Sequence, residues 1–210
     1  EMLDEGALAS AALEAVCTCD QAMQRVTERS YCEGDILTRV ILLQGEDFEL
    51  RLHSWNNLSA DESVWHGHQY PIVVRCLAGG YEQELGVALE NPEGEFRVFG
   101  RRSKPNGGGF ETYPLEGQCT RSMIATKHQV TAGTQYAMST SQLHRLQEVS
   151  SDSHTLTLVM RGSKREKNPL FLASGGAGQD AIDRVRSDVS PAVVKAVVND
   201  ALGQVRQNVK

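Results

Sequence analysis

Two histidines separated by one residue, His66 and His68, are the residues of this sequence best placed to do chemistry. On a β-strand, residues i and i+2 point to the same face, so the two imidazoles would project side by side. Imidazole nitrogen binds Fe, Zn, Cu and Ni. The pair is therefore half of a predicted metal site, and the other half must come from elsewhere in the chain.

The residues that follow this pair indicate how the chain positions it. Pro71 cannot donate a hydrogen bond to a sheet ladder, so we expect it to end or bulge the strand that carries the histidines. Segment 72–77 is rich in β-branched residues, which is typical of a buried strand. A second polar, strand-like segment, 133–145, follows a turn and carries His144.

Together the two segments resemble the motifs of the cupin superfamily. In the first motif, two histidines one residue apart are followed by a glutamate, with a glycine at each end. His66 and His68 match, and Val73, or Ile72 at the shorter spacing, stands where the glutamate would be. The first glycine position is substituted and the last one matches: these positions hold Ala60 and then Gly79 or Gly80.

The second cupin motif supplies the third histidine. Gly133 and His144 match it at the expected spacing. Its proline, second glycine and asparagine are replaced, respectively, by Ser139, Ser141 and Glu148. The resemblance spans 36–173, and it implies that His144 completes one metal site with His66 and His68.

The same resemblance implies a mainly β fold. We expect a cupin barrel, of the double-stranded β-helix or jelly-roll type, with an N-terminal helix and C-terminal helices. The expected divisions of the chain are an N-terminal helical segment packed on the barrel, the barrel itself and the C-terminal helices, at 1–35, 36–173 and 174–210. Helical spacing of apolar residues predicts helices at 4–29, 180–188 and 192–206. The apolar face of the last helix must be buried against the barrel or against a second copy, which makes a homodimer one expectation.

One predicted strand, 48–55, has two contrasting faces. Its even-numbered residues are mostly apolar, whereas its odd-numbered residues, Glu49, Arg51, His53 and Trp55, are charged or aromatic. We expect His53 to be a surface residue or a neighbour of the metal ligands rather than a ligand. We expect His128, before the Gly133 turn, to face solvent.

The missing glutamate leaves three neutral histidine ligands. Ordinary cupins use three histidines and one glutamate, so this set resembles cysteine dioxygenase and its thiol dioxygenase relatives. That resemblance implies Fe(II), with O2 and a small, possibly thiol- or carboxylate-bearing molecule as substrates; Zn, Ni, Mn or Cu would also suit the site. The alternatives are a non-redox metal isomerase, lyase or hydrolase, and a non-catalytic cupin that binds a small molecule.

Three further residues are predicted to act on the substrate. In the cupin pattern Val73 would point into the barrel, and Arg75 would share that direction. A buried Arg75 would be paired with an acidic side chain or would bind an anionic substrate. Tyr70, on the face of the histidine pair, and Tyr136, in the second motif, could act as phenol donors or could serve in packing alone.

Composition excludes several classes of function. The 210 residues carry a net charge of −6, which argues against neutralisation of nucleic-acid phosphates. No apolar run reaches the ~20 residues of a membrane span, and no signal peptide opens the chain. The chain has five cysteines, an odd number, and its sequence has no CxxC motif. We therefore expect free thiols in a reducing, cytoplasmic setting.

Overall fold

The computed structural model describes residues 5–56, 64–103, 110–114, 121–149, 154–165, 170–174 and 186–207. Ala60, at the first glycine position of the motif, and one of the five cysteines, Cys119, lie outside these ranges. Within them, the other four cysteines are free thiols, as expected. None of the described helices has the length and apolar character needed to span a bilayer.

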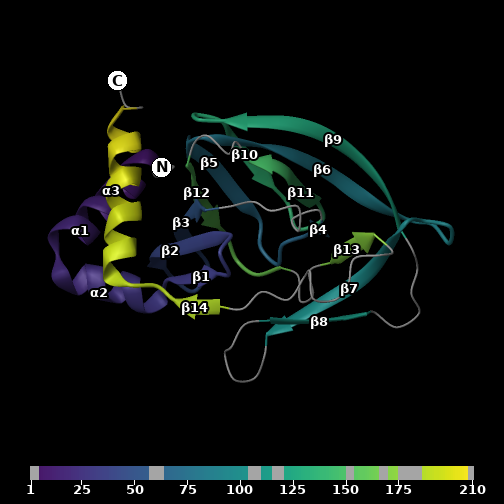
Figure 1. The fold of residues 1–210 in the computed structure, drawn as a ribbon, viewed down its shortest axis with the longest axis horizontal. Helices are drawn as coiled ribbons and strands as arrows, with labels where there is room; N and C mark the ends of the chain where they lie inside the picture. The colour runs from purple at the N-terminus through teal and green to yellow at the C-terminus, as the bar shows by residue number, and fades with distance from the viewer. Residues whose placement is uncertain are drawn as a thin grey trace.

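Two seven-stranded antiparallel sheets form the body of the molecule (Figure 1). Sheet A has the strand order β10-β5-β12-β3-β2-β1-β14, and its strands are Gln135–Met138, Ile72–Ala78, Thr155–Arg161, Glu49–Trp55, Leu37–Gln44, Tyr31–Glu33 and Arg186–Asp188. Sheet B has the order β13-β4-β11-β6-β9-β7-β8, and its strands are Phe171–Ser174, Trp65–His66, Leu143–Val149, Gly80–Glu90, Arg121–Thr131, Phe96–Ser103 and Phe110–Pro114. Strand β13 also pairs with β7. The mainly β barrel fold with terminal helices is therefore confirmed.

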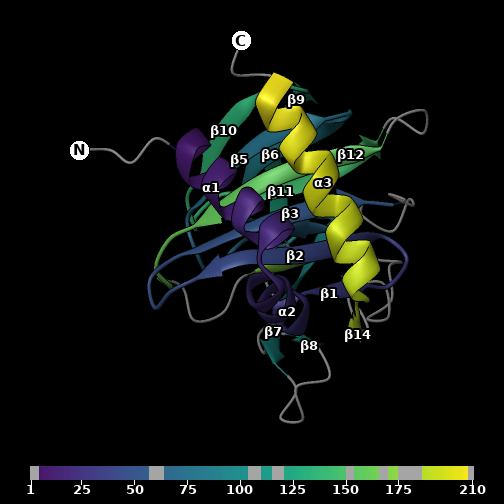
Figure 2. The same cartoon turned by 90° about the vertical axis from the view of Figure 1, so that its left-hand side faces the viewer.

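The three helices cover the outer face of sheet A (Figure 2). They are α1 (Glu5–Thr18), α2 (Asp20–Arg29) and α3 (Pro191–Gln207). One apolar cluster joins them to the sheet, and its strand members include Val40, Leu50, Leu52, Leu156 and Leu158. Burial of apolar surface at this contact, at roughly 25 cal/mol per Å2, holds the helices on the barrel.

The start of α3 follows the rule for helix caps. Ser190 precedes Pro191, and the Oγ of Ser190 accepts a hydrogen bond from the backbone N–H of Val193 at 3.3 Å. A serine cap satisfies a donor that has no partner inside the helix, and proline at the first helical position loses no bond. The cap fixes where the apolar stripe of α3 meets sheet A.

Two expected helices differ from the structure. Segment 4–29 is broken at Cys19, which has extended backbone angles (φ −126°, ψ 113°), so α1 and α2 can pack in different directions. The end of expected helix 180–188 is instead strand β14, which pairs with β1. Both strands lie outside 36–173 yet extend sheet A, and α3 is the one C-terminal helix in the described ranges.

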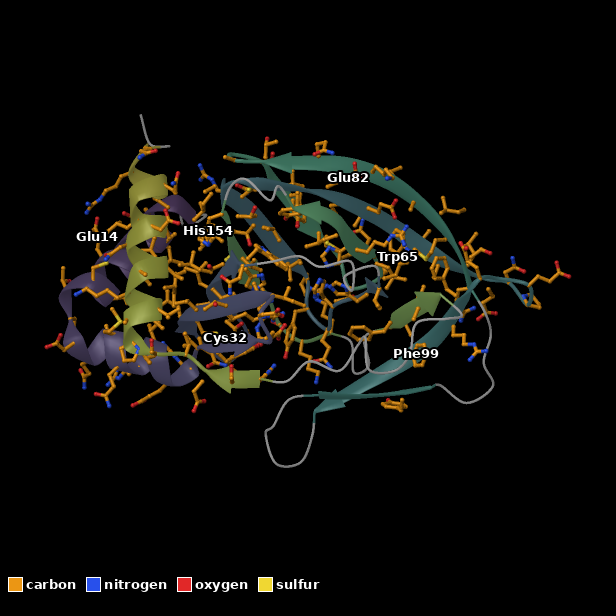
Figure 3. The ribbon with its side chains drawn as sticks, viewed as in Figure 1. Glu14, Cys32, Trp65, Glu82, Phe99 and His154 are labelled. Atoms are coloured by element: carbon orange, nitrogen blue, oxygen red, sulfur yellow. The ribbon has the colours of Figure 1, made fainter. Side chains whose placement is uncertain are left out.

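Around β3, the face of sheet A that looks toward sheet B is polar. The odd-numbered residues of β3 lie on it, opposite the leucines that meet the helices. Glu49, Arg51 and His53 are each less than a tenth exposed. Side chains occupy the space between the two sheets, as Figure 3 shows. The barrel interior, rather than the outer surface, therefore receives the charged face of this strand.

Candidate metal centre

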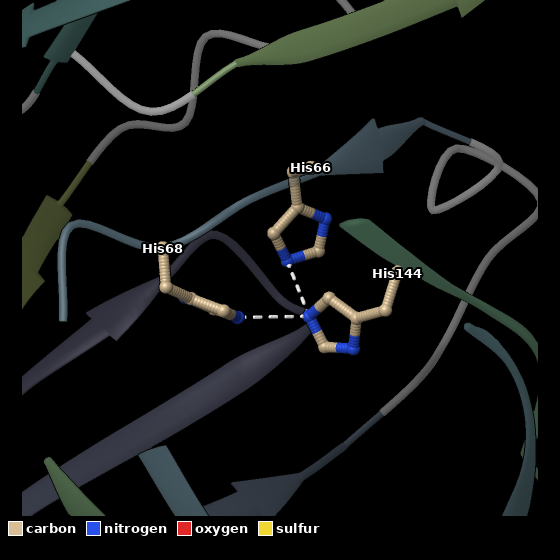
Figure 4. A group of neighbouring side chains, drawn as sticks. All are labelled: His66, His68 and His144. Carbon is tan, nitrogen blue, oxygen red and sulfur yellow. Dashed lines mark hydrogen bonds between the residues drawn. The ribbon is translucent and has the colours of Figure 1, made fainter. Parts of the chain in front are cut away.

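Three imidazole rings converge on one point inside the barrel (Figure 4). The Nε2 atom of His144 lies 2.9 Å from Nε2 of His68 and 3.0 Å from Nε2 of His66. The ring centroids of His66 and His144 are 4.4 Å apart, and those of His68 and His144 are 4.9 Å apart. The structure thus brings together the three predicted metal ligands.

Strand pairing in sheet B places these rings. His66 on β4 is the register partner of His144 on β11 and of Phe171 on β13. The ring of Phe171 stacks on that of His66 at 6.0 Å with an interplanar angle of 11°. Two adjacent strands therefore present two of the ligands on the same face.

His68 reaches the cluster from a loop, because β4 ends at His66. Gly67, between the two histidines, donates its backbone N–H to the carbonyl of Leu170 at 2.9 Å. A Cβ atom at Gly67 would approach the Cδ2 atom of Leu143 at 3.1 Å, so the chain passes close to β11 here. Pro71 lies in the gap before β5, but the expectation that one strand carries both histidines and ends at Pro71 is wrong, because the strand already ends at His66.

The tautomer of His66 is set by a backbone carbonyl. Its Nδ1 atom lies 3.3 Å from the carbonyl oxygen of Val64. A carbonyl only accepts hydrogen bonds, so Nδ1–H is the donor and the lone pair of the neutral ring is on Nε2. His66 consequently presents a metal-binding lone pair to the centre of the cluster.

Hydrogen bonding alone does not satisfy the cluster. If the Nε2 of His144 carries a proton, it can donate to one neighbour; if it carries a lone pair, that lone pair faces the lone pair of His66. The Nδ1 of His144 is buried with no partner among the described residues. Two metal–nitrogen bonds of about 2.1 Å at 90° bring the nitrogens about 3.0 Å apart. The observed spacing fits one metal ion shared by the three rings.

Burial keeps the ligands neutral. Desolvation lowers the pKa of His144 to about 4. Desolvation, with the neighbouring His144 and the charges of Arg51 and Arg39, lowers the pKa of His68 well below 6.5. A histidine must be unprotonated to bind a metal, so both rings are in the competent form at neutral pH.

No carboxylate joins the cluster within the described ranges. Ile72 begins β5 and packs inside the barrel with Val74 and Val159. Val73 is in register with Met160, which packs against the helix-covered cluster. The expectation that Val73 points inward is wrong, because strand alternation turns it outward and Ile72 inward.

Arg75 also lies outside the barrel. Its register partner on β12 is Leu158, a member of the apolar cluster under the helices. Since directly paired residues share a face, the predicted inward direction of Arg75 is wrong, and with it the reason for an anion-binding role.

The two tyrosines lie in different surroundings. The hydroxyl of Tyr136 is 2.7 Å from the hydroxyl of Tyr81. Burial raises the pKa of both phenols, so both keep their protons at neutral pH. The ring of Tyr70 lies under the guanidinium of Arg161, 4.2 Å from its centroid. Substrate contact by Tyr70 and Tyr136 stays a prediction.

The other histidines behave as the strand patterns suggest. His128 is exposed on β9 and pairs with the Thr126 hydroxyl at 2.8 Å, as expected of a solvent-facing residue. His53 is buried inside the barrel, outside the three-ring cluster. Sequence reasoning missed the charged neighbours of His53, although the alternation along 48–55 carried the signal.

Comparison with known proteins gives weak likenesses in structure and none in sequence. No protein-family model and no curated protein matches the chain. Ectoine synthase from P. lautus is similar over 74% of this chain and 93% of its own, with 12% identity and a TM-score of 0.39. KdgF from Halomonas sp. is similar over 66% and 91%, with 15% identity and a TM-score of 0.36. A cupin domain from Bordetella pertussis Tohama I is similar over 63% and 99%, with 10% identity and a TM-score of 0.33. At these identities and TM-scores, no property of those proteins is transferred to this chain.

Proposed function

We propose that His66, His68 and His144 hold one metal ion, with Fe(II) as the first choice, and that the chain is a non-haem oxygenase. Its substrates would be O2 and a small molecule that bears a thiol or a carboxylate. The observation that carries this proposal is that the Nε2 atom of His144 lies 2.9 Å from that of His68 and 3.0 Å from that of His66, with all three ligand atoms within 4.8 Å of one another.

Several groups in and around the cluster would prepare it to bind a metal ion. The Val64 carbonyl holds the lone pair of His66 inward, and burial keeps His68 and His144 unprotonated. The ring of Phe171 stacks on one face of the His66 ring. A ferrous ion in this set would supply open coordination positions at which the substrate and O2 can meet.

A non-redox metal enzyme is the second candidate. Three neutral ligands leave the charge of a divalent ion uncompensated, and no carboxylate of the described residues joins them as a ligand. Such an ion polarises a carbonyl or lowers the pKa of bound water, which suits isomerase, lyase or hydrolase chemistry.

Metal analysis followed by oxygen uptake tests the proposal. The purified chain should retain one iron per molecule, and an oxygen electrode should record uptake with members of a panel of small thiols, diketones and carboxylic acids. Activity with Zn or Ni in the absence of O2 would favour the second candidate. A chain that binds none of these metals would contradict both.

A matched pair of variants controls this experiment. His144→Ala removes a ligand from the buried cluster, whereas His128→Ala removes an imidazole that is exposed on β9. The first should lose metal and oxygen uptake together, and the second should retain both.

A further inference from the structure

The barrel interior beside His68 holds a cluster of charged side chains. The carboxylate of Glu49 is 3.1 Å from the Nη1 of Arg51 and 2.7 Å from the Nη2 of Arg161. The carboxylate of Glu33 is 3.1 Å from the Nη2 of Arg39. Among these five side chains, three guanidinium groups thus face two carboxylates, which leaves one positive charge in excess.

Three buried nitrogen atoms of this region have no partner among the described residues. They are the Nε atoms of Arg39 and Arg51 and the Nε2 atom of His53. Arg39 and His53 are register partners on β2 and β3, and Arg51 lies two residues before His53 on the same face. A buried donor without an acceptor is unfavourable, and more so when it is charged.

These side chains lie close to the metal cluster: the guanidinium of Arg161, which shares the carboxylate of Glu49 with Arg51, is 4.2 Å from the ring centroid of Tyr70, two residues after His68. The charges of Arg51 and Arg39 contribute to the lowered pKa of His68. His68 in turn contributes to the lowered pKa of His53, after burial and the two arginines. The unpaired nitrogens and the predicted metal therefore share one interior.

We propose that Arg39, Arg51 and His53 form an anion subsite that binds the carboxylate of the substrate while another part of the molecule reaches the three-histidine centre. Carboxylate binding by the subsite is independent of the proposed function; only the contact with the three-histidine centre rests on it. One excess positive charge matches a monoanion, and N–H donors in a guanidinium plane suit carboxylate oxygens. The neutral amide of the same molecule would leave the charge uncompensated.

The charge balance of Arg51 supports this assignment. Burial lowers the pKa of Arg51 to about 10, and repulsion from Arg39 adds to the effect more than the attraction of Glu49 opposes it. Arg51 is still cationic at neutral pH. A bound carboxylate would relieve this repulsion.

Fluorescence of Trp55 offers a direct test, because its ring lies 5.9 Å from that of His53 in an edge-to-face arrangement. We would titrate the metal-loaded protein with propionate and with propionamide at constant ionic strength. Propionate should give a saturable change and propionamide should not. Arg51→Lys keeps the charge but removes the Nε donor, and it should raise the Kd of propionate roughly ten- to a hundred-fold.

Arg161→Lys is the matched control, since Arg161 also pairs with Glu49 but its Nε is not among the buried nitrogens that lack a partner. It should leave the Kd of propionate unchanged. Arg39→Lys, at a side chain that is 21% exposed, provides a second test should Arg51→Lys fail to fold. Equal affinity of wild type and both subsite variants would overturn the proposal, as would tighter, Arg51-dependent binding of inorganic phosphate.

Metal content separates this proposal from the proposed function. Arg51→Lys should retain its full metal content. Arg51-dependent propionate binding by a protein that holds no metal would sustain the subsite and contradict the oxygenase. Full metal occupancy with no Arg51-dependent propionate binding would support the metal centre and contradict the subsite.

Discussion

The two faces of strand β3 bury opposite kinds of side chain. The outer face presents Leu50 and Leu52 to the helices, whereas the inner face presents Glu49, Arg51 and His53 to the barrel interior. Both faces are nearly inaccessible to water. Burial alone therefore does not identify the core. The outer face of β3 is an apolar contact that stabilises the fold, whereas its inner face belongs to a buried cluster of charged side chains.

Removing the carboxylate of Glu49, which Arg51 and Arg161 share, should cause the largest loss of stability. Glu49→Leu leaves Arg51 and Arg161 without the partner that now bridges them. Loss of one partner of a buried ion pair costs about 3–5 kcal/mol in the free energy of unfolding. Urea unfolding followed by circular dichroism measures this loss.

Glu14→Leu is the control for that prediction. Glu14 is half-exposed and pairs with Arg206 on the surface, so its removal should cost less than about 1 kcal/mol. Equal losses for the two glutamate variants would mean that the inner face is as well solvated as the surface.

On the outer face, a substitution should lower stability by creating a cavity rather than by leaving a charge unpaired. Leu52 is fully buried under the helices, and Leu52→Ala should lower the free energy of unfolding by about 2–5 kcal/mol. Metal affinity should not change, because the side chain points away from the histidines. A Leu52→Ala protein that is stable but has weakened metal binding would contradict the division between the faces.

Acidification should destabilise the metal-free protein through its inner face. Unfolded histidines take up protons near pH 6.5, whereas burial holds His68 and His144 neutral in the folded state, His144 down to about pH 4. The unfolded state thus binds more protons, and the free energy of unfolding falls as pH falls through this window. Each histidine contributes up to about 1.4 kcal/mol per pH unit.

Urea midpoints of chelator-treated protein across this pH range measure the slope. The His144→Gln variant, which lacks one of these groups, should have a shallower slope than the wild type. An identical slope would mean that His144 titrates alike in the folded and unfolded states.

The smallest effect should come from a polar contact on the outer face. The Oγ of Ser54 is 2.7 Å from the Nε2 of His154, and the Nδ1 of His154 is 3.1 Å from the Oδ2 of Asp200 on α3. The order of groups is that of a hydrolase triad, but Ser54 is buried, so we interpret the relay as a link between α3 and the sheet.

Because His154 and Asp200 are more than one-third exposed, Asp200→Ala should cost about 0.2–1 kcal/mol in thermal or urea unfolding. A fluorophosphonate reagent should leave Ser54 unlabelled. Labelling that depends on His154 would overturn the structural interpretation.

Sequence alone predicted where the strands lie better than it predicted which way their side chains point. The alternation along 48–55 predicted β3 and its two faces, but not that the charged face is the inner one, because that depends on where the helices pack. Likewise, the motif spacing allowed Ile72 or Val73, and only strand register shows that Ile72 points inward.

Long-range pairing explains the remaining differences. The end of 180–188 becomes strand β14 because β1, more than 150 residues earlier in the chain, offers it a free edge. The three ligands were found from sequence because their spacing is local in two segments. The charged neighbours were missed because Arg39, Glu49 and Arg161 come together only in the folded sheet.

The most direct test of the account is an anaerobic titration of the chelator-treated chain with Fe(II), followed by calorimetry. We predict one site per chain in the wild type, loss of that site in His144→Ala, and an unchanged site in Arg75→Leu, whose side chain lies on the outer face of sheet A. Full occupancy and affinity in His144→Ala would contradict the three-histidine centre.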